Sequence, residues 1–296
     1  MGILRHFYYL IESLRPRQWT KNVFIFAGIF FSGQLFVPDK VLEVLFGFFL
    51  FGLASGGIYL LNDIIDIESD RAHPKKSNRP IASGRLSKRA ALCYFIFITL
   101  LGIICSLFLN RNFGLCIITY VLLNIFYSFK AKQIVILDVM CISLGFVIRV
   151  FAGCILVYVT PSDWLIVCSI NISLFLGFCK RRQEANLFFS NNNNTRSVLK
   201  FYNNGFLNQL IAIVTSASFI SYVLYTVSPE TVLRFGNRNL LFTIPFVLYG
   251  IFRYLFLIFG KAGDENPTDI IIKDKPFLLN GILWCLIALV IIYFRN

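Results

Sequence analysis

The sequence predicts an all-α membrane protein, a polytopic transmembrane bundle of about nine helices. Of its 296 residues, 57% are hydrophobic and 17% aromatic, and the mean hydropathy is +0.72. One soluble core could not bury so much apolar surface. Apolar runs of about 20 residues, the length that crosses a bilayer, recur from Val23 onward. They are too long and too uniformly apolar for barrel strands, so each is expected to be a helix whose backbone groups pair internally.

Short polar segments divide these runs into nine expected spans. No change in composition marks a domain boundary, so residues 1–296 are expected to form a single integral membrane domain. Whether copies associate into a homo-oligomer stays open. In chain order, the expected spans are 22–38, 44–62, 90–109, 113–129, 134–158, 163–180, 206–227, 239–260 and 277–294.

The basic residues predict how the chain is oriented in the cell membrane. Twenty-one of the 28 Lys and Arg residues fall in the N-terminal segment and in the loops after the second, fourth, sixth and eighth spans. Arg149 and Arg253 lie inside spans. By the positive-inside rule, the N-terminus is expected in the cytoplasm and the C-terminus outside. The opposite side carries only five basic residues: Lys40, Arg111, Arg234, Arg238 and Arg295.

Charge and cysteine usage disfavour two other classes of function. The formal net charge is +13, but nucleic-acid binding requires a soluble basic face, and here the charges lie in loops between spans. Anionic lipid and phosphate substrates fit that placement better. The eight cysteines occur singly, with no CxxC pair, so neither a metal–thiolate site nor a disulfide framework is expected.

An acidic segment at the end of the second span is the first candidate site. Asn62 and Asp66 lie one helical turn apart, and Asp63, Asp66 and Asp70 share an overlapping face if the helix continues. Carboxylates crowded at a membrane boundary favour a hard cation such as Mg²⁺, bound together with substrate phosphate oxygens. The alternative is an ordinary acidic helix end, solvated by water or paired with the lysines that follow.

A basic loop follows directly, from Arg71 to Gly84, and two prolines end the helix there. Arg and Lys beside a metal site suit a polyphosphate, because Arg can grip phosphate oxygens with two N–H groups while Lys acts as a point charge. Lys76 and Arg79 are therefore candidate ligands, and His73 is a further phosphate contact. Alternatively, the loop anchors the chain by the positive-inside effect, and His73 is a loop or capping residue.

The second candidate site joins the end of the fourth span to the fifth span. Tyr127 and Lys132 precede Asp138, which shares one helix face with Arg149. Ionisable residues so deep in an apolar helix are candidates for function, although they could also pair with other buried groups.

Three further polar groups lie on the side expected to be cytoplasmic. Lys180, Arg181 and Glu184 close the sixth span, and Lys21 opens the first. The groups at the sixth and first spans could instead anchor the chain at the membrane interface, with Trp19 at headgroup depth. Residues 264–274 carry mixed charges and are interpreted as a lid or helix-capping segment.

Four motifs carry a resemblance to a known family. PRQWxKN precedes the first span, NDxxDxxxDRxHPxKxxRPIAxG follows the second, YxxxxKxxxxxD with an Arg eleven residues later follows the fourth, and KRxxE follows the sixth. Together they resemble the UbiA superfamily of intramembrane prenyltransferases, and most closely its phosphoribosyltransferase branch. The resemblance covers nearly the whole chain and matches more loosely towards the C-terminus.

The resemblance implies a Mg²⁺-dependent glycosyltransferase. It would transfer 5-phosphoribosyl from 5-phosphoribosyl 1-diphosphate (PRPP) to a polyprenyl phosphate such as decaprenyl phosphate. The products would be diphosphate and polyprenylphosphoryl-5-phosphoribose, a lipid-linked precursor of cell-envelope polysaccharide.

The resemblance also implies roles for individual residues. Asn62, Asp63, Asp66 and Asp70 would bind the metal, and Asp63, Asp66 and Asp138 are the catalytic candidates. The implied substrate contacts are Lys21, Tyr59, Arg71, His73, Lys76, Arg79, Tyr127, Lys132, Arg149, Lys180, Arg181 and Glu184.

One departure from the wider superfamily bears on the substrate. Aromatic prenyltransferases carry a second DxxxD motif, whereas position 142 here is Ile142, so Asp138 stands alone beside Lys132 and Arg149. Because cations replace the second acidic motif, the site is expected to favour a substrate that carries another phosphate group in addition to its diphosphate. Two alternatives stay open: a prenyltransferase that uses a prenyl diphosphate, and a transporter. A transporter should place its polar groups near the bilayer midplane, whereas here they gather at one face.

Overall fold

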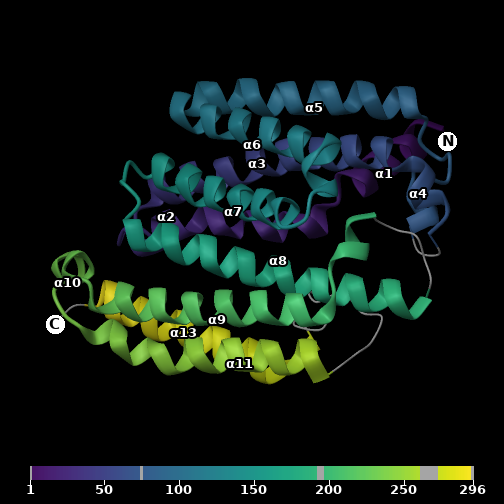
Figure 1. The fold of residues 1–296 in the computed structure, drawn as a ribbon. Coiled ribbons are helices and arrows are strands. Elements are labelled where there is room, and N and C mark those ends of the chain that lie inside the picture. Colours follow the sequence, from purple (N-terminus) through teal and green to yellow (C-terminus); the bar gives the residue numbers. More distant parts are fainter. Residues whose placement is uncertain (1, 74–75, 192–196, 261–272, 295–296) are drawn as a thin grey trace. The chain divides into compact units, whose positions relative to one another are not determined.

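The computed structural model describes residues 2–73, 76–191, 197–260 and 273–294, and within these ranges every regular element is a helix (Figure 1). Segment 264–269 and residues 192–194 of the asparagine run lie outside the described residues. The chain divides into two compact units, Met1–Pro161 and Ser162–Asn296. That residues 1–296 make one domain stays a prediction.

Eight of the described helices are long and apolar enough to cross a membrane. They correspond to the second to ninth expected spans, so the prediction of an all-α polytopic bundle is confirmed. The eight are α3 (Pro38–Ile65), α5 (Lys88–Leu109), α6 (Arg111–Phe129), α7 (Leu137–Leu156), the part of α8 from Asp163 to Asn186, α9 (Asn204–Val227), the segment Asn239–Gly260 and α13 (Lys275–Tyr293).

The first expected span, 22–38, has a different structure. It follows the amphipathic helix α1 (Gly2–Leu14) and consists of a 3₁₀ helix, η1 (Pro16–Ile25), that continues into the short helix α2 (Phe26–Phe31). A 3₁₀ helix has three residues per turn, so Trp19, Asn22 and Ile25 lie on one line along η1. Trp19 packs against Gly52 of α3, and Asn22 and Ile25 are buried.

In the first unit, α3 is the central helix and packs against α1, η1, α5, α6 and α7 (Figure 1). Phe51 of α3 packs with Phe113, Ile117 and Tyr120 of α6 in one buried cluster. A single residue, Asn110, separates α5 from α6, and its side-chain oxygen accepts the N–H groups of residues 112 and 113. This cap satisfies orphan N–H groups at the start of α6 and permits a tight reversal.

Two glycines let η1 and α2 approach α7 at backbone distance. A Cβ on Gly153 would lie 1.8 Å from the carbonyl oxygen of Ile25, and one on Gly28 would lie 2.7 Å from the nitrogen of Cys154. No side chain fits at either position without a shift of backbone. This close contact fixes Asn22 beside the buried face of α7.

Short elements connect the spans of the first unit, and the second unit contains long helices and several short elements. In the first unit they are α4 (Ile67–Arg71), η2 (Lys76–Asn78) and η3 (Ala131–Gln133). In the second unit, α8 (Asp163–Asn191) packs on α9, and α11 (Ile244–Gly260) packs on α13 and α9. The other elements of that unit are η4 (Ser197–Phe201), α10 (Pro229–Phe235) and η5 (Asn239–Thr243).

Candidate active site

The acidic segment lies where α3 ends and α4 begins. Helix α3 ends at Ile65 because Asp66, at φ −93° and ψ 12°, leaves the helical conformation, and α4 restarts at Ile67. The predicted helix face is therefore interrupted at Asp66. Asp63 and Asp70 are nonetheless both buried, and we call Asn62, Asp63, Asp66 and Asp70 the acidic centre.

Each carboxylate of the acidic centre pairs with a cation from another segment. Arg79 Nη1 lies 2.5 Å from Asp70 Oδ2 and 3.2 Å from Asp63 Oδ1, and Arg15 also pairs with Asp63. Lys132 Nζ, from η3, lies 2.6 Å from Asp66 Oδ1. The predicted candidates Arg79 and Lys132 are thus brought together with the carboxylates, although 16 and 66 residues separate the partners in sequence.

Asn62 is held by α6. Ser128 Oγ donates to Asn62 Oδ1 at 2.5 Å, while Ser128 itself is buried. Tyr127, the neighbouring candidate, is half-buried near the end of the same helix. The contact ties the acidic centre to the second candidate site.

The donor set of the acidic centre fits a hard cation such as Mg²⁺, because it consists of carboxylate and amide oxygens. Across the described ranges, no group of three or more His, Cys, Asp or Glu side chains is arranged to hold a metal ion. In the structure, the carboxylates of the acidic centre are instead paired with Arg15, Arg79 and Lys132. Metal binding by these oxygens would require the cations to move onto another anion.

Arg149 is buried among neutral groups. Its Nε donates to Asn22 Oδ1 at 2.8 Å, Nη1 donates to the Gly145 carbonyl at 2.7 Å, and Nη2 donates to the Tyr120 hydroxyl at 3.0 Å. Its guanidinium also lies over the rings of Phe51, Tyr120 and Phe146. Asp138 is fully buried in the first turn of α7, and its Oδ1 accepts the N–H of Val139, so the two charges on this helix are not an ion pair.

Lys21 lies beside Arg149 and Arg15. Lys21 interacts electrostatically with both arginines. Tyr59 of α3 interacts electrostatically with the same two arginines, and the Arg15 guanidinium lies 5.3 Å from its ring. We call Arg15, Lys21 and Arg149 the cationic centre.

The other loop candidates order the backbone. Arg71 Nε donates to the carbonyl of Ala82 at 3.0 Å, and His73 Nδ1 accepts the backbone N–H of Lys76 at 3.3 Å. These contacts fold the loop back towards α4. That Arg71, His73 and Lys76 contact a phosphate stays a prediction.

Three candidates belong to the second unit. Arg181 is buried on α8 and pairs with Glu184, and Lys180 Nζ lies 3.8 Å from a Glu184 carboxylate oxygen. They form one ion-paired group within their own unit. Their contribution to a substrate site stays a prediction.

Sequence reasoning missed four residues of the site: Arg15, Asn22, Tyr120 and Ser128. Arg15 precedes Pro16 and adopts φ 50° and ψ 63°, a left-handed conformation that is uncommon for a residue with a side chain. This turn carries the chain from α1 into η1 and brings Arg15 to Asp63. Asn22 belongs to the PRQWxKN motif, and what the sequence does not show is its hydrogen bond with Arg149.

The fold and the site together define an integral membrane protein of helices with a cluster of paired carboxylates and cations at the end of α3. Residues 22–183 match the UbiA prenyltransferase family, and the chain belongs to this family. It is accordingly a membrane-embedded transferase.

Similar proteins include named relatives and solved structures. Decaprenyl-phosphate phosphoribosyltransferase of Mycolicibacterium smegmatis is 29% identical over 93% of this chain and 89% of its own. The Corynebacterium glutamicum protein of that name is 28% identical over 96% and 86%. A UbiA homolog from Archaeoglobus fulgidus, solved with DMAPP and Mg²⁺, superposes with a TM-score of 0.71 over 96% of this chain and 98% of its own, at 17% identity. That likeness shows the fold.

Proposed function

We propose that this protein transfers the 5-phosphoribosyl group of PRPP to a polyprenyl phosphate and releases diphosphate. The names of its phosphoribosyltransferase relatives support both the donor and the lipid acceptor. In this proposal, the product is a lipid-linked sugar phosphate for the cell envelope. The site faces the cytoplasm, where the positive-inside rule places it.

The observation that carries the proposal is the cationic centre. Arg149 is 5% exposed and contacts only neutral partners, and Lys21 makes no hydrogen bond or ion pair with any described residue. Buried charges without counter-ions are costly, so this arrangement calls for a bound anion. Of the five N–H donors of Arg149, three are used, which leaves two for phosphate oxygens.

The acidic and cationic centres suit a donor that carries phosphate at two places. The acidic centre would hold Mg²⁺ through Asn62, Asp63, Asp66 and Asp70, and the bound ion would neutralise charge on the departing diphosphate. Arg79 and Lys132, released from their carboxylates, can then bind the diphosphate oxygens. Lys21 and Arg149 would bind the 5-phosphate of the donor or the phosphate of the acceptor.

The transfer itself requires little proton chemistry. The bond between ribose C1 and the diphosphate oxygen breaks, and its electron pair leaves with diphosphate. An oxygen of the acceptor phosphate, already ionised near neutral pH, forms the new bond to C1. The main task of the chain is to place that oxygen in line behind C1, since positioning alone can contribute several kcal/mol, roughly 7–11 in the best cases.

Ile142 distinguishes this reaction from prenyl transfer. A second DxxxD motif would place a carboxylate at position 142, one turn beyond Asp138, and would favour a second metal. Ile142 stands there instead, and the same helix carries Arg149. A prenyl diphosphate carries no phosphate apart from its diphosphate, whereas PRPP also carries a 5-phosphate.

The proposal is tested by giving the purified protein, in nanodiscs, Mg²⁺, ¹⁴C-labelled PRPP and a polyprenyl phosphate. We expect a labelled lipid-soluble product that mild acid hydrolyses, and no such product without Mg²⁺ or without acceptor. The matched reaction replaces PRPP with a prenyl diphosphate and an aromatic acceptor. Turnover in that reaction, with none from PRPP, would make the protein a prenyltransferase; activity in neither would favour transport.

A further inference from the structure

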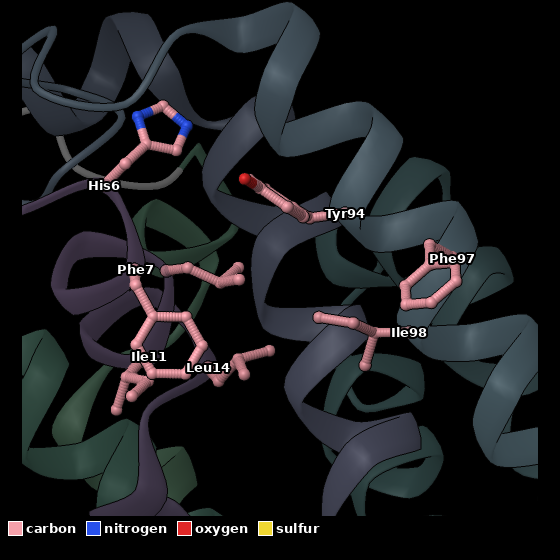
Figure 2. A pocket seen from close by; sticks show the side chains of 8 residues that line it. His6, Phe7, Ile11, Leu14, Tyr94, Phe97 and Ile98 are labelled. Carbon is pink, nitrogen blue, oxygen red and sulfur yellow. The ribbon is translucent and has the colours of Figure 1, made fainter. Parts of the chain in front are cut away.

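A groove on the first unit lies apart from the candidate active site. It has a volume of about 840 Å³ between α1 and α5, and Figure 2 shows His6 of α1 near Tyr94 of α5, with Phe97 and Ile98 following along α5. The His6 and Tyr94 rings are 5.9 Å apart. The lining is otherwise almost entirely apolar: Phe7, Leu10, Ile11 and Leu14 from α1, and Phe97 and Ile98 from α5. A groove of this size and lining suits a hydrocarbon chain.

The groove does not open towards the acidic centre. Its inner wall includes Leu10 and Ile98, which belong to one buried cluster with Leu60 and Ile64 of α3. Those two residues flank the stretch of α3 that carries Asp63. A polyprenyl tail whose phosphate lies at the candidate active site would have to pass through this packed cluster to reach the groove.

Both helices carry basic side chains before the first residues that line the groove, His6 on α1 and Tyr94 on α5. Lys88 and Arg89 begin α5, and Arg5 lies one residue before His6. All three are exposed, and none forms an ion pair with a described residue. Cations at the start of a helix oppose the helix dipole, so helix stability does not explain Lys88 and Arg89. They supply the charge that an anionic headgroup requires.

The geometry points to a binding site for an anionic phospholipid of the membrane leaflet adjoining the acidic centre. One acyl chain lies in the groove between α1 and α5, and the phosphate lies at Arg5, His6, Lys88 and Arg89. Amphipathic helices such as α1 bind membranes through the same combination of an apolar face and basic side chains.

The same site reaches the acidic centre through α1. The carbonyl of Leu14, the last residue of α1, accepts the indole N–H of Trp19 at 3.2 Å, and Arg15 follows at once and pairs with Asp63. A lipid that fixes α1 against α5 therefore also fixes Arg15. As a result, anionic lipid should raise the stability of the protein.

The test measures thermal stability in detergent with phosphatidylglycerol or with phosphatidylcholine of the same chains. We expect phosphatidylglycerol at ten times its Kd to raise Tm by about 3 °C more than phosphatidylcholine does. Ile11→Trp, at a position 41% exposed within the groove, should abolish most of this rise. The double variant Lys88→Glu/Arg89→Glu should leave equal shifts with the two lipids.

Matched controls lie on α6, away from the groove. Leu115→Trp changes an apolar residue that is 50% exposed, and Arg111→Glu reverses an exposed charge. Both should keep the preference for phosphatidylglycerol. Equal shifts with the two lipids in the unmodified protein, or loss of the preference in the controls as well, would overturn the proposal.

A second measurement needs no variant. Phosphatidylglycerol with a diazirine in its acyl chain should label peptides from residues 6–14 and 94–98, and unlabelled phosphatidylglycerol should compete. Labelling spread over all lipid-facing helices would contradict a defined site. Competition by polyprenyl phosphate but not by phosphatidylglycerol would assign the groove to the acceptor instead, and would leave the proposed reaction intact.

Discussion

Arg149 shows how a protein can keep a charge deep in an apolar helix without a carboxylate partner. Three aromatic rings and three neutral hydrogen-bond acceptors surround its guanidinium. Cation–π contacts and hydrogen bonds offset part of the cost of burial, and the net positive charge remains available. Such a site attracts an anion more strongly than an ion pair would.

The first prediction concerns the fork of Arg149. Loss of the Arg149 side chain should lower kcat/KM roughly a hundredfold, or about 2–3 kcal/mol, and Arg149→Lys should recover only part of this. The three N–H groups of an ammonium cannot serve the three protein acceptors and also grip a phosphate with a planar fork. Steady-state kinetics with each substrate varied in turn, and Tm, would measure this. Arg111→Lys, on an exposed arginine, is the control. Asp138→Asn should not rescue the variant, since the two residues are not paired; a rescue would show that Arg149 serves only to neutralise Asp138.

The second prediction concerns the positive charge of Lys21. Lys21 interacts electrostatically with Arg149 and Arg15, so its charge adds to theirs at a bound phosphate. Lys21→Met should lower kcat/KM roughly tenfold, because one charge-assisted phosphate contact is lost. Lys21→Arg should keep most of the activity, and steady-state kinetics with each substrate varied in turn would measure both variants. Full activity of Lys21→Met would remove Lys21 from the phosphate site.

The residues predicted from sequence and those missed differ in one physical respect. Asp66, Lys132 and Arg149 were predictable because a charge at the end of, or inside, an apolar run is costly enough to indicate a site. Arg15 was not, because its role depends on a left-handed turn that directs it to Asp63, 48 residues away. Local sequence carries no signal for such a contact.

At the scale of elements, two carboxylates at the junction of α3 and α4 differ in how deeply they are buried. The Asp66 side chain is 34% exposed, whereas that of Asp70 is 3% exposed and pairs with Arg79. Exposed ion pairs contribute little to stability, and breaking buried ones is costly. The two carboxylates should therefore respond differently to the same substitution.

The third prediction follows from this contrast. Asp66→Ala should abolish activity and change the free energy of unfolding by less than about 1 kcal/mol. Asp70→Ala should lower it by about 2 kcal/mol, after allowance for the partial exposure of Arg79. Glu68→Ala, on the exposed face of α4, should change neither. Full activity of Asp66→Ala at ordinary Mg²⁺ concentration would remove Asp66 from the metal site.

The fourth prediction concerns the contact of η1 with α7. Gly153→Ala should lower the free energy of unfolding by about 3 kcal/mol, because its Cβ would overlap the carbonyl of Ile25 and force the backbones apart. Asn22 would then move away from Arg149, so kcat/KM should fall too. Gly102→Ala, where the new Cβ meets its neighbours at 3.5 Å or more, is the matched control. Equal stability of the two variants would show that η1 shifts without cost.

Hydropathy predicted nine helical spans, and eight of them are long helices, but it could not distinguish a 3₁₀ helix from an α-helix in the first. The choice is made by tertiary contacts: Trp19 against Gly52, Asn22 with Arg149, and Ile25 against Gly153. In an α-helix, each step of three residues would rotate a side chain by about −60°, so these three could not face the same neighbours.

For the whole molecule, the distribution of basic residues predicts an odd number of membrane crossings. A fifth prediction is that reporters fused to the two ends report opposite sides: a fluorescent protein at the N-terminus should be active in the cytoplasm, and alkaline phosphatase at the C-terminus should be active outside. A fusion in the loop between α6 and α7 serves as a cytoplasmic reference. Two ends on the same side would mean that the segment before α3 does not cross.

The rise per residue of η1 bears on that count. Ten residues at about 2.0 Å each, followed by six of α2 at about 1.5 Å, extend roughly 29 Å from Pro16 to Phe31. An α-helix of the same sixteen residues would extend only about 24 Å and fall short of a hydrocarbon core of about 30 Å. These sixteen residues would be too short to cross a bilayer as an α-helix. Because a 3₁₀ helix rises more per residue, they extend nearly as far as an ordinary transmembrane helix does. That reach is what the predicted crossing requires, since the chain would then place Asn22 against Arg149 and begin α3 on the far side of the bilayer.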